Sequence, residues 1–100
     1  MRIARPPNGF RIIEKPTVTQ LIEAESVSWP RLKQHWIDIK ERLKFVAHKE
    51  GTEDRRLGPG HRIFKAAGYP DFGIPTVRLV YHVLGDQVTI VAAAVLDSRT

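Results

Sequence analysis

Two side chains able to do chemistry on phosphate esters lie in one stretch of the chain, Thr76 to Val95. Arg78 carries a guanidinium group, which binds phosphate through paired hydrogen bonds and stabilises negative charge that builds up in a transition state. His82 carries an imidazole, whose ordinary pKa of about 6.5 suits a general acid or base near neutral pH. The alternatives are an Arg78 that pairs with a surface carboxylate and a solvent-facing His82 without a role.

This stretch has the pattern of a β-hairpin with a two-residue turn at Gly85 and Asp86. Val, Ile, Tyr and Thr dominate both arms, and glycine supplies the backbone angles of a primed turn. Pairing Leu84 with Gln87 predicts one apolar face, made by the pairs Val83–Val88, Tyr81–Ile90, Leu79–Ala92 and Val77–Ala94. The other face then carries the pairs Arg78–Ala93, Val80–Val91 and His82–Thr89. We therefore expect Arg78 and His82 to lie together on the face away from the core.

The elements that must position this hairpin precede it in the chain. Residues 10–15 are a strand candidate that ends at Pro16, and Thr17 with Gln20 has the form of a capping box that begins a first helix. A second helix is expected from Pro30 to Gly51, capped by Ser28 or Trp29. Its apolar residues recur with helical spacing at Leu32, Trp36, Ile39, Leu43 and Val46.

A further strand candidate, residues 61–66, lies between the second helix and the hairpin. The order strand, helix, helix, then three strands predicts a single α+β domain over residues 1–100. We expect a small, largely antiparallel sheet with both helices on one face. The uncovered face would then be the one that carries Arg78 and His82.

The charge distribution favours a polyanionic partner, either nucleic acid or an acidic protein. Sixteen Lys and Arg residues against eleven Asp and Glu residues give a formal net charge of +5. The basic excess is concentrated in residues 31–66, where Arg55 and Arg56 lie in a Gly- and Pro-containing loop and Lys65 follows in the next strand candidate. These three cations either bind a phosphate backbone or form an ordinary solvated surface.

The composition also argues against several other classes of protein. The chain has no cysteine, which excludes disulfides and thiolate metal sites. Its four histidines, His35, His48, His61 and His82, lack the close spacing of metal ligands, so we expect no metal and no cofactor. No apolar run approaches the roughly 18 residues of a membrane span, and the first residues have no apolar signal region. We expect a cytoplasmic protein with no membrane partner.

The pattern resembles the RelE/ParE superfamily of toxins from type II toxin-antitoxin systems. The resemblance covers about residues 29–99 and is clearest in the strand Arg78-Leu79-Val80-Tyr81-His82-Val83, in the turn Leu84-Gly85-Asp86-Gln87, and in the apolar strand from Val88 to Val95. His61-Arg62-Ile63-Phe64 is similar to the preceding strand of the family. The resemblance implies a small sheet whose open concave face is the working surface.

In the RNA-cleaving members, basic residues on that face hold the phosphate while a ribose 2'-hydroxyl attacks it, on mRNA within the ribosome. The resemblance makes Arg78 and Arg62 the matching residues, with His82 as the nearby proton-exchanging group and Arg99 as the match to an arginine after the last strand. Phe64 departs from the pattern, because a second basic residue is often found there. The family's aromatic or acid-base residue after the last strand has no counterpart in Leu96-Asp97-Ser98-Arg99-Thr100.

Two functions are therefore expected as alternatives. The first is a RelE-like endoribonuclease that cleaves mRNA, with catalytic Arg78, Arg62 and His82 and with Arg55, Arg56, Lys65 and Arg99 binding the nucleic acid. The second is a ParE-like toxin that inhibits DNA gyrase by protein contact without catalysis. A basic RNA-binding domain with no toxic role is a third alternative. Either toxin would have an acidic antitoxin protein as its partner.

Overall fold

The computed structural model describes residues 8–96, which form two helices and a five-stranded sheet. The elements in order are β1 (Arg11–Glu14), α1 (Pro16–Glu25), α2 (Leu32–Val46), β2 (Thr52–Glu53), the 3-10 turn η1 (Arg55–Leu57), β3 (His61–Ala66), the 3-10 turn η2 (Pro70–Phe72), β4 (Thr76–Leu84) and β5 (Gln87–Leu96). The α+β class is confirmed. Four strands follow the helices instead of the three expected, because the two-residue β2 precedes β3.

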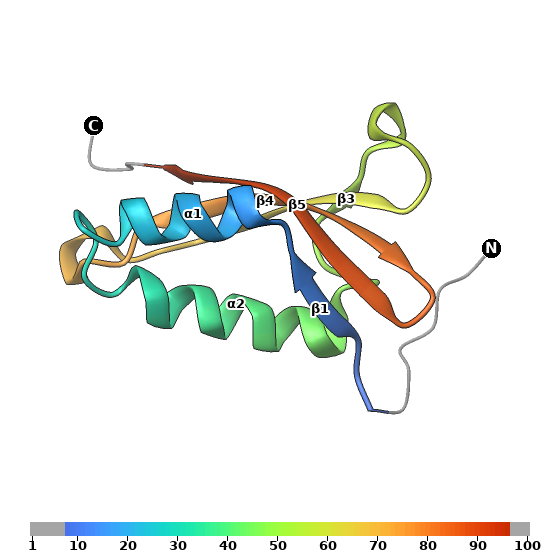
Figure 1. The fold of residues 1–100 in the computed structure, drawn as a ribbon, viewed down its shortest axis with the longest axis horizontal. Coiled ribbons are helices and arrows are strands. Elements are labelled where there is room, and N and C mark those ends of the chain that lie inside the picture. Colours follow the sequence, from blue (N-terminus) through green and yellow to red (C-terminus); the bar gives the residue numbers. More distant parts are fainter. Residues whose placement is uncertain (1–7, 97–100) are drawn as a thin grey trace.

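The sheet has the strand order β1-β5-β4-β3-β2 and is mixed. The pairs β2–β3, β3–β4 and β4–β5 are antiparallel, whereas β1 runs parallel to β5. Helices α1 and α2 follow β1 in the chain and precede the other strands, and Figure 1 shows them next to one another. This helical pair returns the chain so that the first and last strands can lie side by side.

Both helices bury their apolar residues against one face of the sheet, as predicted. The predicted residues Leu32, Trp36, Ile39 and Leu43 of α2 are buried, together with Val18 and Ile22 of α1. They share one core cluster with the inward-facing strand residues Val77, Leu79, Tyr81, Val83, Val88 and Ile90. Val46 is only half-buried, and the fully buried Ala47 takes the next place along the helix.

The predicted helix ends are wrong in three places. Helix α1 begins at Pro16, where proline suits the first turn, and Thr17 makes no capping bond. Helix α2 begins at Leu32 instead of Pro30 and ends at Val46, well before Gly51. Gly51 has φ +67 and lies so close to the Ile63 carbonyl oxygen that an added Cβ would lie 2.1 Å from it. Glycine is therefore required at the crossing from α2 to the sheet, and is not the helix stop.

The hairpin register is confirmed near the turn and wrong beyond it. The pairs from Leu84–Gln87 to Tyr81–Ile90 are as predicted. A β-bulge then shifts the register by one residue, so that Arg78 faces Ala94 and Leu79 faces Ala93. The three consecutive alanines carry no polarity contrast that could reveal this shift from sequence. As a result Ala92 and Ala94 are exposed, while Ala93 and Val95 pack against the core.

Among residues 8–96, none of the helices is both long enough and apolar enough to cross a membrane.

Candidate nucleic-acid interface

The face of the sheet opposite the helices carries a double row of side chains from β3 and β4. The register pairs His61 with His82, Ile63 with Val80, and Lys65 with Arg78. We call these six residues the open-face row. It has a cationic pair at one end, an apolar pair in the middle and an imidazole pair at the other end.

The backbone hydrogen bonds show which of these pairs lie closest. The Val83 amide donates to the Gly60 carbonyl at 3.0 Å, so Gly60 and Val83 are a hydrogen-bonded pair. Hydrogen-bonded and non-hydrogen-bonded pairs alternate along an antiparallel ladder. Lys65 and Arg78 therefore form a non-hydrogen-bonded pair, in which the Cα atoms lie about 4.5 Å apart and the side chains approach closely. Like charges directly opposite one another are unfavourable in a sheet. Neither cation forms an ion pair with any carboxylate in residues 8–96.

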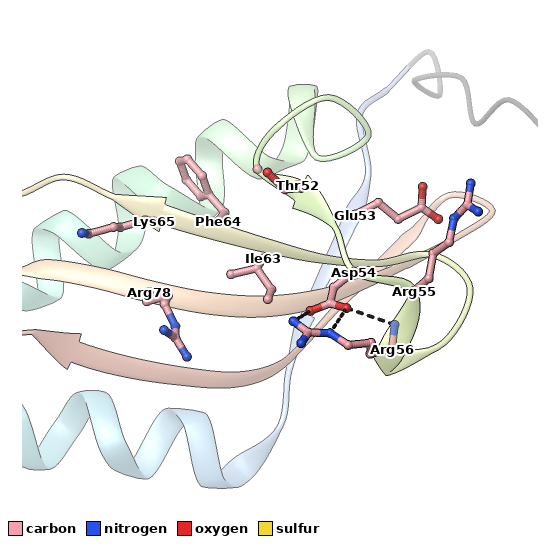
Figure 2. A pocket seen from close by; sticks show the side chains of 10 residues that line it. Thr52, Glu53, Asp54, Arg55, Arg56, Ile63, Phe64, Lys65 and Arg78 are labelled. Carbon is pink, nitrogen blue, oxygen red and sulfur yellow. Dashed lines mark hydrogen bonds and ion pairs between the residues drawn. The ribbon is translucent and has the colours of Figure 1, made fainter.

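A shallow groove of about 740 Å³ lies between this cationic pair and the loop of η1. We call it the basic groove; its lining is Gly51, Thr52, Glu53, Asp54, Arg55, Arg56, Ile63, Phe64, Lys65 and Arg78. Figure 2 shows Ile63 and Arg78 on one side of the strands and Phe64 on the other. The groove thus brings together four of the predicted site residues, namely Arg55, Arg56, Lys65 and Arg78.

The four cations of the groove are not equally available to a ligand. The Arg56 guanidinium donates to Asp54 from Nε at 3.1 Å and from a terminal nitrogen at 3.0 Å, and the Arg56 amide donates to the same carboxylate at 3.0 Å. These hydrogen bonds lower the pKa of Asp54 and raise the pKa of Arg56. Asp54 therefore caps η1 and holds the Arg56 guanidinium in an ion pair. Arg55, Lys65 and Arg78 are the cations left exposed for a polyanion.

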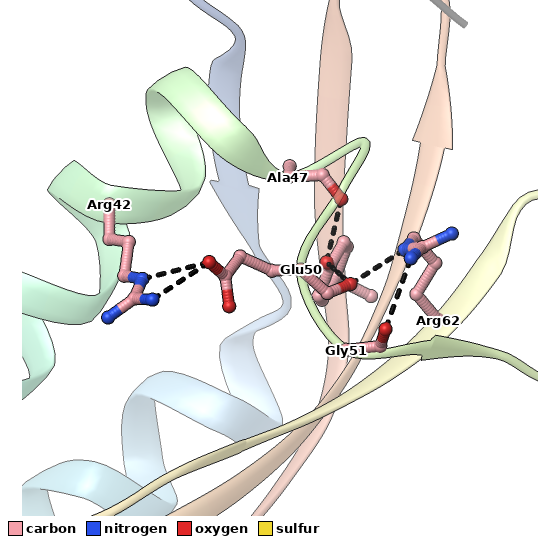
Figure 3. Close-up of polar contacts among 6 residues, drawn as sticks. Arg42, Ala47, Glu50, Gly51 and Arg62 are labelled. Atoms are coloured by element: carbon pink, nitrogen blue, oxygen red, sulfur yellow. Dashed lines mark hydrogen bonds and ion pairs between the residues drawn. The ribbon is translucent and has the colours of Figure 1, made fainter. Parts of the chain in front are cut away.

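The expectation that Arg62 lies beside Arg78 is wrong. Arg62 pairs with the core-facing Tyr81 and so points to the helix side of the sheet. Its guanidinium donates to the Glu50 carbonyl at 2.7 Å and to the Gly51 carbonyl at 3.2 Å (Figure 3). A cation that bonds the last carbonyls after a helix satisfies them and opposes the negative end of the helix dipole. In this position Arg62 holds the end of α2 to the sheet.

Tyr81 supports the same junction from within the core. Its hydroxyl lies 2.7 Å from the Ala47 carbonyl oxygen and 2.9 Å from that of Glu50, so its single proton can be donated to either. Burial raises the pKa of Tyr81 to about 12, against the opposing effect of the nearby Arg62 charge. Tyr81 is therefore a neutral packing residue, as its register predicted.

His82 lies on the same face as Arg78, as predicted, but not next to it. They are four positions apart along β4, which places their Cα atoms roughly 13 Å apart. The neighbour of His82 is His61, with ring centroids 4.5 Å apart and ring planes inclined by 28°. His61 has no expected role from the sequence alone. Its even spacing from Lys65, four residues along the same strand, places both side chains on one face.

The structure also places Phe64, Lys65 and the two tryptophans. Lys65 is the β3 cation on the open face, whereas Phe64 lies on the helix side under Arg42. Trp29 and Trp36 are buried packing residues. Two of the exposed aromatic residues, Tyr69 and Phe72, lie at η2, where each is 66% exposed. Arg99 lies outside the described residues.

Within residues 8–96, no group of three or more His, Cys, Asp or Glu side chains has a geometry that could hold a metal ion. The arrangement instead offers cations that bind phosphate and imidazoles that exchange protons.

Fold and site together define an α+β domain with a basic groove on the open face of its sheet. No family model, no curated protein and no solved structure matches the chain.

Proposed function

We propose that this protein is the toxin of a type II toxin-antitoxin system, a RelE-like endoribonuclease that binds mRNA along the open face of its sheet and cleaves it, most readily on the ribosome. The observation that carries the proposal is the Lys65–Arg78 pair. Two like charges are held directly opposite one another, exposed and without a carboxylate partner among residues 8–96. A bound phosphate would remove the repulsion between them.

The groove extends this binding surface beyond a single phosphate. Arg55 of η1 also lines the groove, and Ile63 lies between the cationic pair and the imidazole pair. A chain of phosphates held at separate points suits single-stranded RNA, whose backbone can follow a groove while its bases remain exposed. Arg78, Lys65 and Arg55 are the phosphate-binding residues in this proposal.

The catalytic roles are revised accordingly. Arg78 remains the phosphate-binding guanidinium and His82 remains the group that exchanges a proton. Arg62 has a structural role, because its guanidinium is occupied by two backbone carbonyls. The site of action would be the cytoplasm, where mRNA is translated.

The proposed partner is an acidic antitoxin that covers the basic groove and neutralises Lys65 and Arg78. An antitoxin segment that folds on binding can wrap a large surface of a small domain. Co-expression with the neighbouring open reading frame and copurification test this partner. Failure to recover a complex, together with harmless expression of this protein alone, would remove the toxin proposal.

The central test compares Arg78→Ala with Arg31→Ala. Both changes remove one exposed arginine charge, but Arg31 lies at the start of α2, away from the groove. We expect Arg78→Ala to abolish growth inhibition, to weaken RNA binding and with it mRNA cleavage, and to reduce the salt dependence of RNA binding by about 0.7 in the logarithmic slope. Arg31→Ala should match the unaltered protein. Equal behaviour of the two variants would overturn the proposal.

The non-enzymatic ParE-like alternative is favoured by one observation. Arg62 is fixed in the fold and His82 is roughly 13 Å from Arg78, so fewer groups surround a phosphate at Arg78 than a cleavage site needs. In that case expression would inhibit DNA gyrase and leave mRNA intact. A basic RNA-binding domain would instead bind RNA without inhibiting growth.

A further inference from the structure

We infer that His61 and His82 form a proton-transfer pair that cleaves RNA at a ribose 2'-hydroxyl, with His61 as the general base and His82 as the general acid. The inference rests on the proposed function and deepens it, since it adds a second imidazole, His61, and assigns the general base and the general acid. It is carried by the contact between the two rings on the open face, with centroids 4.5 Å apart.

The position of the pair follows from the sheet. His61 and His82 are a non-hydrogen-bonded pair like Lys65 and Arg78, so their side chains approach closely on the same face. The two rings are inclined by only 28° and can therefore present nitrogens to one phosphate from neighbouring strands. Both residues are half-buried, which limits their movement while leaving an edge accessible.

The hydrogen bonding of His61 selects its role. Its Nδ1 lies 3.3 Å from the Gly58 carbonyl oxygen. Because a carbonyl oxygen only accepts, Nδ1 must carry the proton, and the neutral ring then has an unprotonated Nε2. A backbone carbonyl at one imidazole nitrogen fixes both the tautomer and the orientation of the ring. His61 is thereby held ready to accept a proton.

His82 has a different environment. No hydrogen bond to its ring is formed by any of residues 8–96, so neither ring nitrogen is committed to another group of this part of the chain. The ring occupies space that Gly60 leaves open. A Cβ at Gly60 would lie 3.1 Å from Cδ2 and 3.2 Å from Nε2 of His82, and 2.8 Å from the Val83 carbonyl oxygen. Glycine at this position, with φ +78, makes room for the imidazole pair.

The reaction balances with these two groups alone. The 2'-hydroxyl gives its proton to Nε2 of His61 as the bond between O2' and phosphorus forms. The bond between phosphorus and O5' breaks, and O5' takes a proton from His82. The products are a 2',3'-cyclic phosphate and a 5'-hydroxyl. Water then returns a proton to His82 and removes one from His61, so no oxidant, reductant or metal is consumed.

The rest of the open-face row would position the substrate. A phosphate at Lys65 and Arg78 lies at the far end of the row from the imidazoles, so it is a neighbour of the scissile phosphate and not the same group. Ile63 and Val80 lie between the two ends and offer an apolar contact to the intervening nucleotide. This geometry resolves the separation of Arg78 from His82.

The test uses an RNA with a single ribonucleotide in an otherwise 2'-deoxy strand, presented alone and as mRNA on programmed ribosomes. A second substrate replaces the 5'-bridging oxygen at the cleavage position by sulfur, a leaving group that needs no proton. We expect His61→Asn and His82→Asn each to cleave the oxygen substrate about a hundredfold to ten-thousandfold more slowly. The sulfur substrate should restore His82→Asn to within about tenfold of the unaltered protein and should not restore His61→Asn.

In His61→Asn the amide can keep the hydrogen bond to the Gly58 carbonyl while lacking a basic nitrogen. Melting temperature and RNA binding are measured for both variants, so that lost proton transfer is distinguished from lost folding or binding. Undiminished cleavage in either variant, or equal rescue of both by sulfur, would overturn the inference. If the protein binds RNA and inhibits growth through Arg78 but produces no cyclic phosphate, the proton-transfer pair fails while RNA binding stands.

Discussion

The Arg62 guanidinium donates a 2.7 Å hydrogen bond to the Glu50 carbonyl, so a cation of β3 is tied to the turn that follows α2. The Tyr81 hydroxyl lies 2.9 Å from the same carbonyl oxygen, and the Glu50 side chain accepts from Arg42 on the helix. One residue after the helix is thus bonded to both layers of the domain. The junction fixes α2 against the strands that carry the basic groove.

Arg62→Ala tests the structural role of this arginine. We expect it to lower the free energy of unfolding by about 1 to 3 kcal/mol, because the part-buried Glu50 carbonyl and the exposed Gly51 carbonyl lose a charged donor. That loss corresponds to a fall of several degrees in melting temperature for a domain of this size. Thermal and urea unfolding measure it, with the exposed Arg78→Ala as the matched control near zero. Unchanged stability with lost cleavage would return Arg62 to a catalytic role.

Lys65→Glu tests the repulsion on the open face. It places a carboxylate directly opposite Arg78, so we expect stability to rise by roughly 0.2 to 1 kcal/mol while RNA binding is lost. Urea unfolding and RNA titration are the two measurements. Lys33→Glu, on the exposed surface of α2, changes the net charge equally and breaks only an ion pair with Glu23. If both variants bind RNA alike, total charge and not the Lys65–Arg78 pair governs binding.

Polar substitutions at Ala93 and Ala94 distinguish the bulged register from the regular one. Glutamine is the matched replacement, because a lysine at position 94 would face Arg78 and add repulsion. Ala94 is exposed, so Ala94→Gln should change stability by no more than about 0.5 kcal/mol. Ala93 packs against the core, so Ala93→Gln should destabilise by more than about 1 kcal/mol. Chemical unfolding of the two variants decides the matter. The reverse order of effects would restore the register without a bulge.

Tyr81→Phe tests the alkaline behaviour of the fold. The folded-state pKa of Tyr81 is raised to about 12, above the ordinary value of 10.0, so the phenol is neutral in both states below about pH 10. Between these values the unfolded chain loses the proton and the folded chain keeps it, so stability should fall as pH rises from about 10 to 12, by an amount of order 2 kcal/mol. Tyr81→Phe should be less stable at pH 7 but lack this part of the alkaline loss.

Unfolding at several alkaline pH values, with the exposed Tyr69→Phe as control, measures the difference between the Tyr81→Phe variant and the unaltered protein. If the Tyr81→Phe variant and the unaltered protein lost the same stability with rising pH, Tyr81 would ionise in the folded protein as readily as in the unfolded chain.

The sequence alone determined the features that depend on local periodicity. Apolar residues at helical spacing fixed the buried face of α2, and the turn at Gly85 and Asp86 fixed the register of the adjoining hairpin pairs. Alternation in β4 placed Arg78 and His82 on the face away from the core. Each of these relations acts between residues close in the chain, so the pattern of side chains carries enough information to define it.

Only the tertiary structure decided which way β3 faces. Each face of β3 carries both basic and apolar residues, so the sequence pattern does not decide whether Arg62 or Lys65 shares the face of Arg78. Pairing with β4 and the carbonyls after α2 resolve the choice, because they turn Arg62 towards the helix and leave Lys65 exposed opposite Arg78. The contact of His61 with His82 arises in the same way, from a register between strands that no local pattern specifies.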